Sequence, residues 1–137
     1  MTKLLLNIEE EYDFFLIGIS CHAKDYRLCW EMNRLLNIDL ARTEDLDINL
    51  KTSIGKFSFY EFIDEENYSE YFLISNRSAK GFLIPEQKNT DFLFMIKGAA
   101  YDSLIEEISE KIGASEIVLT SYNIDVDSLK SKQNLLF

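Results

Sequence analysis

Cys21 and His22 are the residues whose types and spacing most directly suggest catalysis. They are neighbours just before a predicted helix that begins near Asp25. A helix N-terminus and an imidazolium both stabilise a thiolate, which is the reactive form of cysteine. Neighbours on a strand point to opposite faces, however, and free cysteine is among the most buried residue types. The pattern therefore favours a buried thiol and a surface histidine over a catalytic pair.

Other familiar catalytic and metal-binding patterns are missing from the sequence. One histidine and two cysteines are too few for a closed zinc site of four nitrogen or sulfur ligands. There is also no glycine-rich phosphate loop and no nucleophile elbow. The sequence therefore predicts no catalytic residues, no metal site and no cofactor.

Two glutamates on a predicted hairpin form a further candidate. A register that pairs Ile63 with Tyr68 sets Glu61 opposite Glu70. Opposed carboxylates repel each other and raise one pKa, as some acid-base catalysts require. More acids occupy the turn between the strands, so a solvated role that protects the sheet edge is favoured.

The only proline, Pro85, lies in an apolar-flanked loop with two carboxylates, Glu86 and Asp91. Proline fixes its own backbone and restricts the preceding residue, so we expect both carboxylates in defined positions. Capping of backbone amides or pairing with a basic residue is favoured over contact with a ligand. The basic residues considered are Arg27, Arg77 and Lys88.

Aromatic and basic side chains alternate along the first predicted helix. Trp30 has Tyr26 one turn earlier and Arg34 one turn later, which allows an exposed aromatic-cation strip. Packing of these aromatics in the core is the favoured alternative. Taken with the loop and the hairpin, the candidate binding residues are Pro85, Glu86, Asp91, Tyr26, Arg27, Trp30, Tyr60 and Tyr71.

Periodicity predicts the elements that position these residues. A hairpin of strands 3–8 and 14–20 precedes a helix that Asp25 caps and Asn37 ends. The segment 39–56 is predicted to be a long connection with a short element of its own. The apolar face of the helix contains Leu28, Cys29, Met32, Leu35 and Leu36.

The second half of the chain contains the strongest hairpin pattern, with strands 57–63 and 68–74 flanking an acidic turn. Its register sets Phe59 opposite Phe72 and Phe57 opposite Ile74. Further predicted elements are a central strand over 92–96 that ends at Gly98, a helix over 101–112 that ends at Gly113, and a last strand over 117–119.

This order predicts an α+β fold, a two-layer sandwich of a largely antiparallel five- to six-stranded sheet with two amphipathic helices. Longin- or profilin-like and extended ferredoxin-like arrangements both fit. Residues 1–124 form the predicted single domain, and residues 125–137 form a C-terminal tail. The tail is either loosely attached or docked through Leu135, Leu136 and Phe137.

Composition restricts the class of partner. The 137 residues carry a formal charge of −10, which repels nucleic-acid phosphates and anionic membranes. No segment approaches membrane-spanning length, and the apolar run at the start is too short for a signal peptide. Two cysteines fit reduced thiols, so we expect a cytoplasmic protein.

Three segments cover much of residues 14–98: Gly18–Trp30, Asn76–Ser78 with Gly81 and Phe82, and Ile84–Phe92. Together they resemble the bacterial IPExxxVDY family, known mainly from Bacteroidetes, whose signature corresponds to Ile84–Phe92. Ile84, Pro85, Glu86 and Asp91 match, whereas Thr90 replaces Val and Phe92 replaces Tyr. Phe92 cannot supply a tyrosine hydroxyl. That family has no assigned activity, and the resemblance implies a small cytoplasmic bacterial protein of a kind often encoded near ribonuclease III and pyruvate kinase genes.

These observations favour a noncatalytic protein-binding or regulatory domain, with a protein partner or a homodimer. Both faces of the central hairpin are apolar, and two helices are expected to cover only one of them. The uncovered face, which includes Tyr60 and Tyr71, would bind a second copy or the docked tail. The alternatives are an RNA-associated accessory factor, or an enzyme that uses Cys21 and His22.

Overall fold

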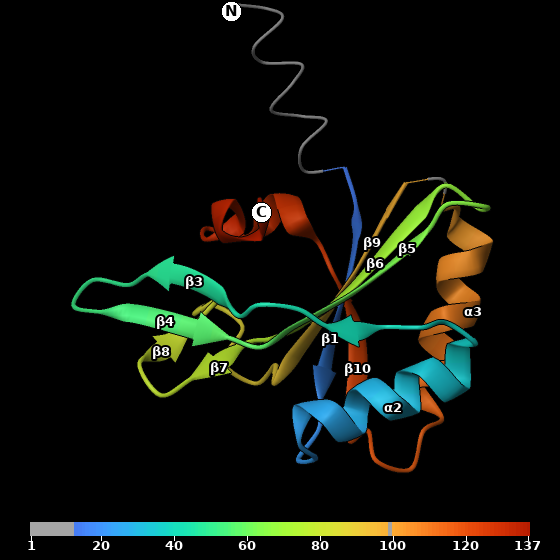
Figure 1. Cartoon of the computed structure of the whole chain (residues 1–137), viewed down its shortest axis with the longest axis horizontal. Coiled ribbons are helices and arrows are strands. Elements are labelled where there is room, and N and C mark those ends of the chain that lie inside the picture. Colours follow the sequence, from blue (N-terminus) through green and yellow to red (C-terminus); the bar gives the residue numbers. More distant parts are fainter. Residues whose placement is uncertain (1–12, 99) are drawn as a thin grey trace, which may run out of the picture.

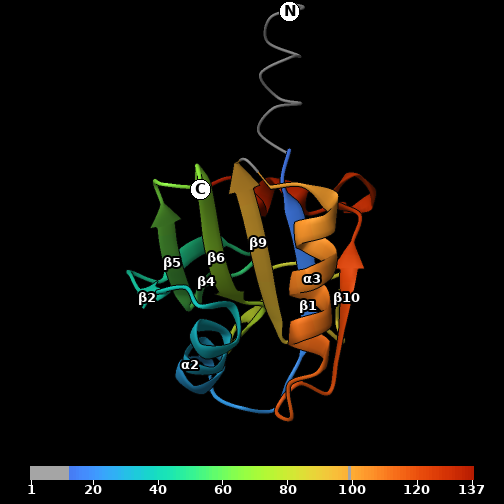
Figure 2. The same cartoon turned by 90° about the vertical axis from the view of Figure 1, so that its right-hand side faces the viewer.

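The computed structural model describes residues 13–98 and 100–137, and its centre is a six-stranded antiparallel sheet (Figure 1). The strands run in the order β10-β1-β9-β6-β5-β2. They are β1 (Phe15–Ser20), β2 (Ala41–Arg42), β5 (Phe59–Asp64), β6 (Ser69–Ser75), β9 (Phe92–Gly98) and β10 (Thr120–Ile124). Helices α2 (Asp25–Leu36) and α3 (Asp102–Gly113) lie on one face (Figure 2). The predicted α+β sandwich is confirmed.

Both helices bury the apolar stripe that their periodicity predicts. Leu28, Cys29 and Met32 of α2 and Ile105, Ile108 and Ile112 of α3 share one core cluster with the sheet. Asn37 ends α2 in the left-handed conformation, with φ of 54°. No helix in the described ranges combines the length and apolar character that crossing a bilayer requires.

Strand β9 is central, as predicted, and its first five residues are buried on both faces. It pairs with β1 on one side and β6 on the other. Helix α3 connects it to β10, which runs in the same direction with β1 between them. Gly98 ends the strand with φ of 96°, and a Cβ there would lie 2.1 Å from the carbonyl oxygen of Tyr68.

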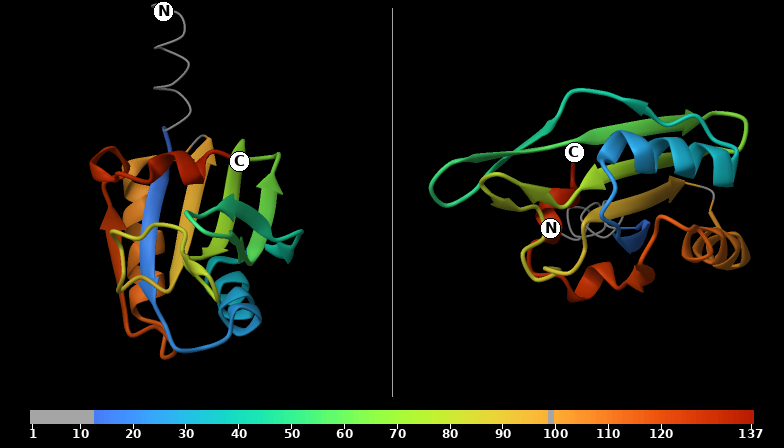
Figure 3. Two further views of the ribbon diagram at one scale, coloured as in Figure 1. Left: turned by 90° about the vertical axis from the view of Figure 1, so that its left-hand side faces the viewer. Right: turned by 90° about the horizontal axis from the view of Figure 1, so that it is seen from below.

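Two small hairpins, a loop and the C-terminal turns cover the second face of the sheet, opposite the helices (Figure 3). They are the hairpin β3 (Leu46–Asn49) and β4 (Ile54–Phe57), the hairpin β7 (Arg77–Ser78) and β8 (Gly81–Phe82), the loop 83–91, and the 3-10 turns η1 (Val126–Ser128) and η2 (Lys132–Leu135). Leu135 is fully buried, and the Phe137 ring contacts Phe59 and Phe72 at centroid distances of 4.8 and 5.3 Å. The docked-tail alternative is confirmed.

The predicted register of the central hairpin is wrong by two residues. Glu61 faces Phe72, and Ile63 faces Glu70. The reason lies in the turn, which extends to Tyr68 at φ of 53°. Strand β6 therefore begins one residue later than predicted, and the opposed carboxylate pair does not form.

Three other predicted segments are 39–56, 117–119 and 3–8. The connection 39–56 contains β2, β3 and part of β4, more structure than predicted. The predicted strand 117–119 is wrong, because these residues form a loop before β10, whose edge position gives it a mixed polar sequence, TSYNI. The predicted strand 3–8 lies outside the described residues.

Candidate functional site

The loop that resembles a family signature is folded around one buried amide, the side chain of Asn76. This side chain is fully buried. Its Nδ2 donates to the carbonyl oxygens of Gln87 and Thr90, both at 2.9 Å, and to that of Ile84 at 3.5 Å. Its Oδ1 accepts from the Ile84 amide at 2.7 Å. The sequence does not reveal this role of Asn76, because its partners lie 8 to 14 residues further along the chain.

Asp91 connects the same loop to the segment before α2. Its Oδ2 accepts from the Cys21 amide at 2.9 Å, and its Oδ1 pairs with Arg77 Nε at 2.5 Å. Arg77 also donates to the carbonyl oxygen of Lys88 at 2.9 Å. The prediction that a loop carboxylate caps an amide or pairs with a basic residue is therefore confirmed for Asp91.

Pro85 and Glu86 are exposed at the surface, and Glu86 connects the loop to the C-terminal tail. Its Oε2 accepts from the Ser131 amide, just before η2, at 2.7 Å. Partial burial by itself would raise the pKa of Glu86, but backbone amide hydrogen bonds outweigh it and lower that pKa. The ionised carboxylate is thus the form that holds the tail.

Glu86→Gln should lower stability modestly at neutral pH, by no more than about 1 kcal/mol because the carboxylate is exposed. The pKa of Glu86 is lower in the folded protein than in the unfolded chain, where it is about 4.3, so the ionised carboxylate stabilises the fold at any pH above about 4.3. This contribution is lost as the pH falls through the pKa of the folded protein. Urea unfolding should therefore show a difference at pH 7 that disappears in acid. Glu65→Gln, an exposed change in the β5–β6 turn, is the matched control and should show no such dependence. A difference that is equal at both pH values would contradict the charge-based link.

Cys21 and His22 line a cleft of about 620 Å³ between α2 and the signature loop. Cys21 is buried, and its Sγ accepts from the Ala23 amide at 3.4 Å. Burial raises the pKa of this thiol, and burial likewise raises the pKa of Cys29 to about 11. His22 is exposed. A thiol that stays protonated at neutral pH is a poor nucleophile, so the geometry speaks against catalysis by this pair.

Both arginines that line this cleft are paired with carboxylates of the same chain. Arg42 pairs with Asp25 at 3.1 Å and with Asp45 at 2.9 Å. Arg77 pairs with Asp91, as described above. The Arg42–Asp25 pair joins β2 to the start of α2, and carboxylates neutralise both arginines.

The outer face of α2 presents aromatic and basic side chains to solvent. Tyr26 is 67% exposed and Trp30 is 65% exposed, so their predicted packing in the core is wrong. Beside Trp30 lies a groove of about 420 Å³ between α2 and the loop 114–117. We refer to Tyr26, Arg27, Trp30 and Arg34 as the aromatic-arginine face.

Glu31 forms the floor of that groove and holds Arg34 in place. It is buried, and its two oxygens accept from Ser115 Oγ at 2.6 Å and from Arg34 Nε at 2.9 Å. The Ser115 hydroxyl is the main cause of its lowered pKa. The three-residue spacing to Arg34 could have indicated the ion pair. No local sequence pattern indicates the contact with Ser115, which lies 84 residues further along the chain.

Tyr60 and Tyr71 do not form an exposed surface. Both are buried in the core between the sheet and the helices, and burial raises the pKa of Tyr60 to about 12. The opposite face of the hairpin is covered by β3, β4 and the tail. The prediction that one face of the hairpin stays uncovered is therefore wrong, and the tail covers part of that face.

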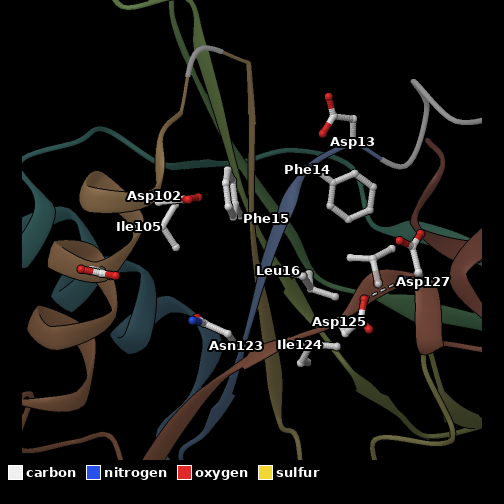
Figure 4. Close-up of a pocket in the computed structure, with 12 residues that line it drawn as sticks. Asp13, Phe14, Phe15, Leu16, Asp102, Ile105, Asn123, Ile124, Asp125 and Asp127 are labelled. Carbon is white, nitrogen blue, oxygen red and sulfur yellow. Dashed lines mark hydrogen bonds between the residues drawn. The ribbon is translucent and has the colours of Figure 1, made fainter.

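An acidic pocket, which sequence analysis did not find, lies where β10 leaves the sheet (Figure 4). Its volume is about 430 Å³, and none of its lining residues is basic. Across residues 13–98 and 100–137, no three His, Cys, Asp or Glu side chains are placed to hold a metal ion. Its acidic lining residues are Asp13, Asp102, Glu106, Asp125 and Asp127.

Comparison of the chain with protein-family models and with curated proteins finds no match. The resemblance of residues 84–92 to the IPExxxVDY signature therefore stays a prediction. Within the described chain, Glu86 and Asp91 of this segment bind the backbone amides of Ser131 and Cys21, and Asn76 binds its backbone carbonyls.

Proposed function

We propose that this protein is a noncatalytic protein-binding domain whose partner docks on the aromatic-arginine face of α2. The observation that carries the proposal is Trp30, the only tryptophan of the chain, exposed beside a groove and flanked by Arg27 and Arg34. Tryptophan, tyrosine and arginine dominate the energetic centres of protein interfaces. A binding face of this composition on an otherwise acidic chain supports recognition of a protein.

The chemistry of the face defines what the partner should offer. Arg34 already pairs with Glu31. Among the described residues, no carboxylate lies within ion-pair distance of Arg27, as the ion pairs of the structure involve other cations. We therefore expect an apolar side chain that fills the groove beside Trp30 and an acidic side chain opposite Arg27.

RNA association is less well supported. It requires the arginines to form one uninterrupted surface. Arg42 lies in the cleft with Cys21, bound to two aspartates, whereas Arg27 and Arg34 line the groove beside Trp30. The charge of −10 also opposes binding to a phosphate backbone.

Trp30→Ala should strongly reduce partner capture without destabilising the protein. Loss of a central tryptophan costs about 2 kcal/mol or more of binding, roughly a thirtyfold weaker affinity. An exposed side chain changes stability by only about 0.5 kcal/mol. Quantitative affinity capture from native lysate, with and without nuclease, measures the first effect, and a urea unfolding curve measures the second.

Tyr68→Ala removes an exposed aromatic ring from the β5–β6 turn and is the matched control. It should recover the same proteins as the parent. Equal recovery by Trp30→Ala and Tyr68→Ala would refute the assignment of the face. Loss of every captured protein on nuclease treatment would favour the RNA-associated alternative instead.

A further inference from the structure

Strand β10 forms one outer edge of the sheet, and its outward side has no partner strand. All five of its residues, Thr120–Ile124, pair with β1 on the inner side. Figure 2 shows β10 as the outermost strand on that side of the molecule. Across residues 13–98 and 100–137, no other backbone group bonds to this strand. Because alternate residues of an antiparallel strand direct their amides and carbonyls to the same side, β10 offers a row of free backbone donors and acceptors.

This edge lacks the features that usually prevent strand pairing. Edges in natural proteins are commonly protected by charged side chains, proline, a bulge or a covering element. The sequence of β10, TSYNI, contains no charge and no proline, and its pairing with β1 advances residue by residue without a bulge. The opposite edge differs, because β2 has two residues and one of them, Arg42, forms two ion pairs. A further strand can therefore join the sheet at β10.

Helix α3 places carboxylates beside the end of β10. Asn123 Oδ1 accepts from Ser109 Oγ at 3.1 Å, which sets this flank of the helix next to the strand. Asp102 and Glu106 line the acidic pocket together with Asn123. Within the described ranges, the ion pairs use other carboxylates. The edge thus combines free backbone groups with negative charge at one end.

The two ends and two faces of the edge define the sequence that fits it. Leu119, directly before β10, is 62% exposed, so the other end is apolar. Asn123 faces α3, and cross-strand neighbours share a face of the sheet. Since successive side chains of a strand alternate between faces, an added strand should direct every second residue toward α3. Basic residues at alternate positions would then lie beside Asp102 and Glu106.

Charge decides between a second copy and a different protein as the occupant. Two β10 strands paired about a two-fold axis would place the α3 helices of both copies on one face of a joined sheet. Each copy carries a formal charge of −10, and both helices are rich in acids. Repulsion between like charges opposes this pairing, whereas a basic segment is attracted.

We propose that β10 receives an extended segment of a partner protein, with basic residues at alternate positions near one end and apolar residues near the other. In this mode of recognition, backbone pairing supplies affinity and the side chains supply specificity. The site is separate from the aromatic-arginine face of α2, and it does not depend on the proposed function.

A synthetic peptide tests the proposal on the full chain. The probe is a fluorescent, end-blocked Lys-Thr-Lys-Val-Thr-Val peptide, and anisotropy measures its binding at low and at high salt. We expect saturable binding that weakens with salt, as an interaction of exposed charges does. Asn123→Lys adds a positive charge to the edge and should weaken binding about tenfold. The matched control Asn49→Lys makes the same change at an exposed position of β3 and should bind like the parent.

A second pair of variants serves if Asn123→Lys fails to fold. Asp102→Asn with Glu106→Gln removes the carboxylates beside the edge and should also weaken binding about tenfold. Glu65→Gln with Glu66→Gln makes a matched charge change in the β5–β6 turn and should have no effect. Trp30→Ala should leave peptide binding unchanged, so this proposal and the proposed function can fail independently.

Two N-methylated peptides test the backbone pairing itself. One carries N-methyl groups on its odd-numbered amides, and the other carries them on its even-numbered amides. An added strand bonds to β10 through alternate amides only. We therefore expect one of the two peptides to lose binding and the other to keep it, although their charges are identical.

Four outcomes would overturn the proposal. Absence of saturable binding by the unmodified peptide rejects a site for a basic segment. Equal binding of both N-methylated peptides reduces the interaction to charge attraction without strand pairing. Equal weakening by a variant and its matched control shows that only the overall charge matters. A dimer of the parent in light scattering that Asn123→Lys dissociates would make a second copy the occupant of the edge.

Discussion

Replacing Asn76 by alanine is expected to lower the free energy of unfolding by about 3 kcal/mol, one of the largest effects of any single polar substitution in this chain. The side chain is fully buried and makes four hydrogen bonds to the backbone of the loop 84–90. Its removal leaves the Ile84 amide and the Gln87 and Thr90 carbonyls without this partner inside the protein. Each buried unpaired group costs about 1–3 kcal/mol, and relaxation of the loop recovers part of the sum. Urea denaturation followed by circular dichroism measures the change.

Asn89→Ala is the matched control for Asn76→Ala. It makes the same chemical change in the same loop, but its side chain is exposed. Its free energy of unfolding should stay within about 0.5 kcal/mol of the parent. If Asn76→Ala is equally mild, the loop does not depend on the buried amide for its conformation.

Leu135→Ala should lower the free energy of unfolding by about 2–4 kcal/mol and expose apolar surface on the sheet. Leu135 is fully buried in the second core cluster, and it anchors the turn that brings Phe137 onto Phe59 and Phe72. Detachment of the tail would uncover these rings. Thermal unfolding measures the first effect, and binding of a hydrophobic dye measures the second.

Leu119→Ala deletes the same atoms from an exposed leucine and serves as the control. We expect a melting curve and dye binding close to those of the parent. A Leu135→Ala protein that melts like Leu119→Ala would mean that the sheet face keeps its cover without the tail anchor.

The elements with strong periodicity could be predicted from sequence. Strand β9 is a continuous apolar run, and α3 repeats its apolar residues at three- and four-residue spacing. In both, one local pattern determines burial, so long-range contacts add little information. The burial of Cys21 and the pairing of Asp91 could also be predicted from general rules, since free cysteines are usually buried and buried polar groups are usually hydrogen-bonded.

The features that sequence analysis missed depend on partners far away in the chain. Glu31 contacts Ser115, and the acidic pocket combines residues from 13–16, 102–106 and 123–127. Strand β10 lies at an edge, so only part of it is buried and its apolar signal is weak. The hairpin register shifted because Tyr68 belongs to the turn, which depends on a positive φ that tyrosine rarely adopts.

The exposure of Trp30 determines what the intrinsic fluorescence of this protein can report. As the only indole, and one already in contact with water, it changes its surroundings little when the chain unfolds. An emission-based melting curve would therefore have a small amplitude that says little about the core. Docking of a partner on α2 would instead remove the indole from water and shift its emission to shorter wavelength. The protein thus carries a label-free optical reporter of occupancy at the proposed binding face.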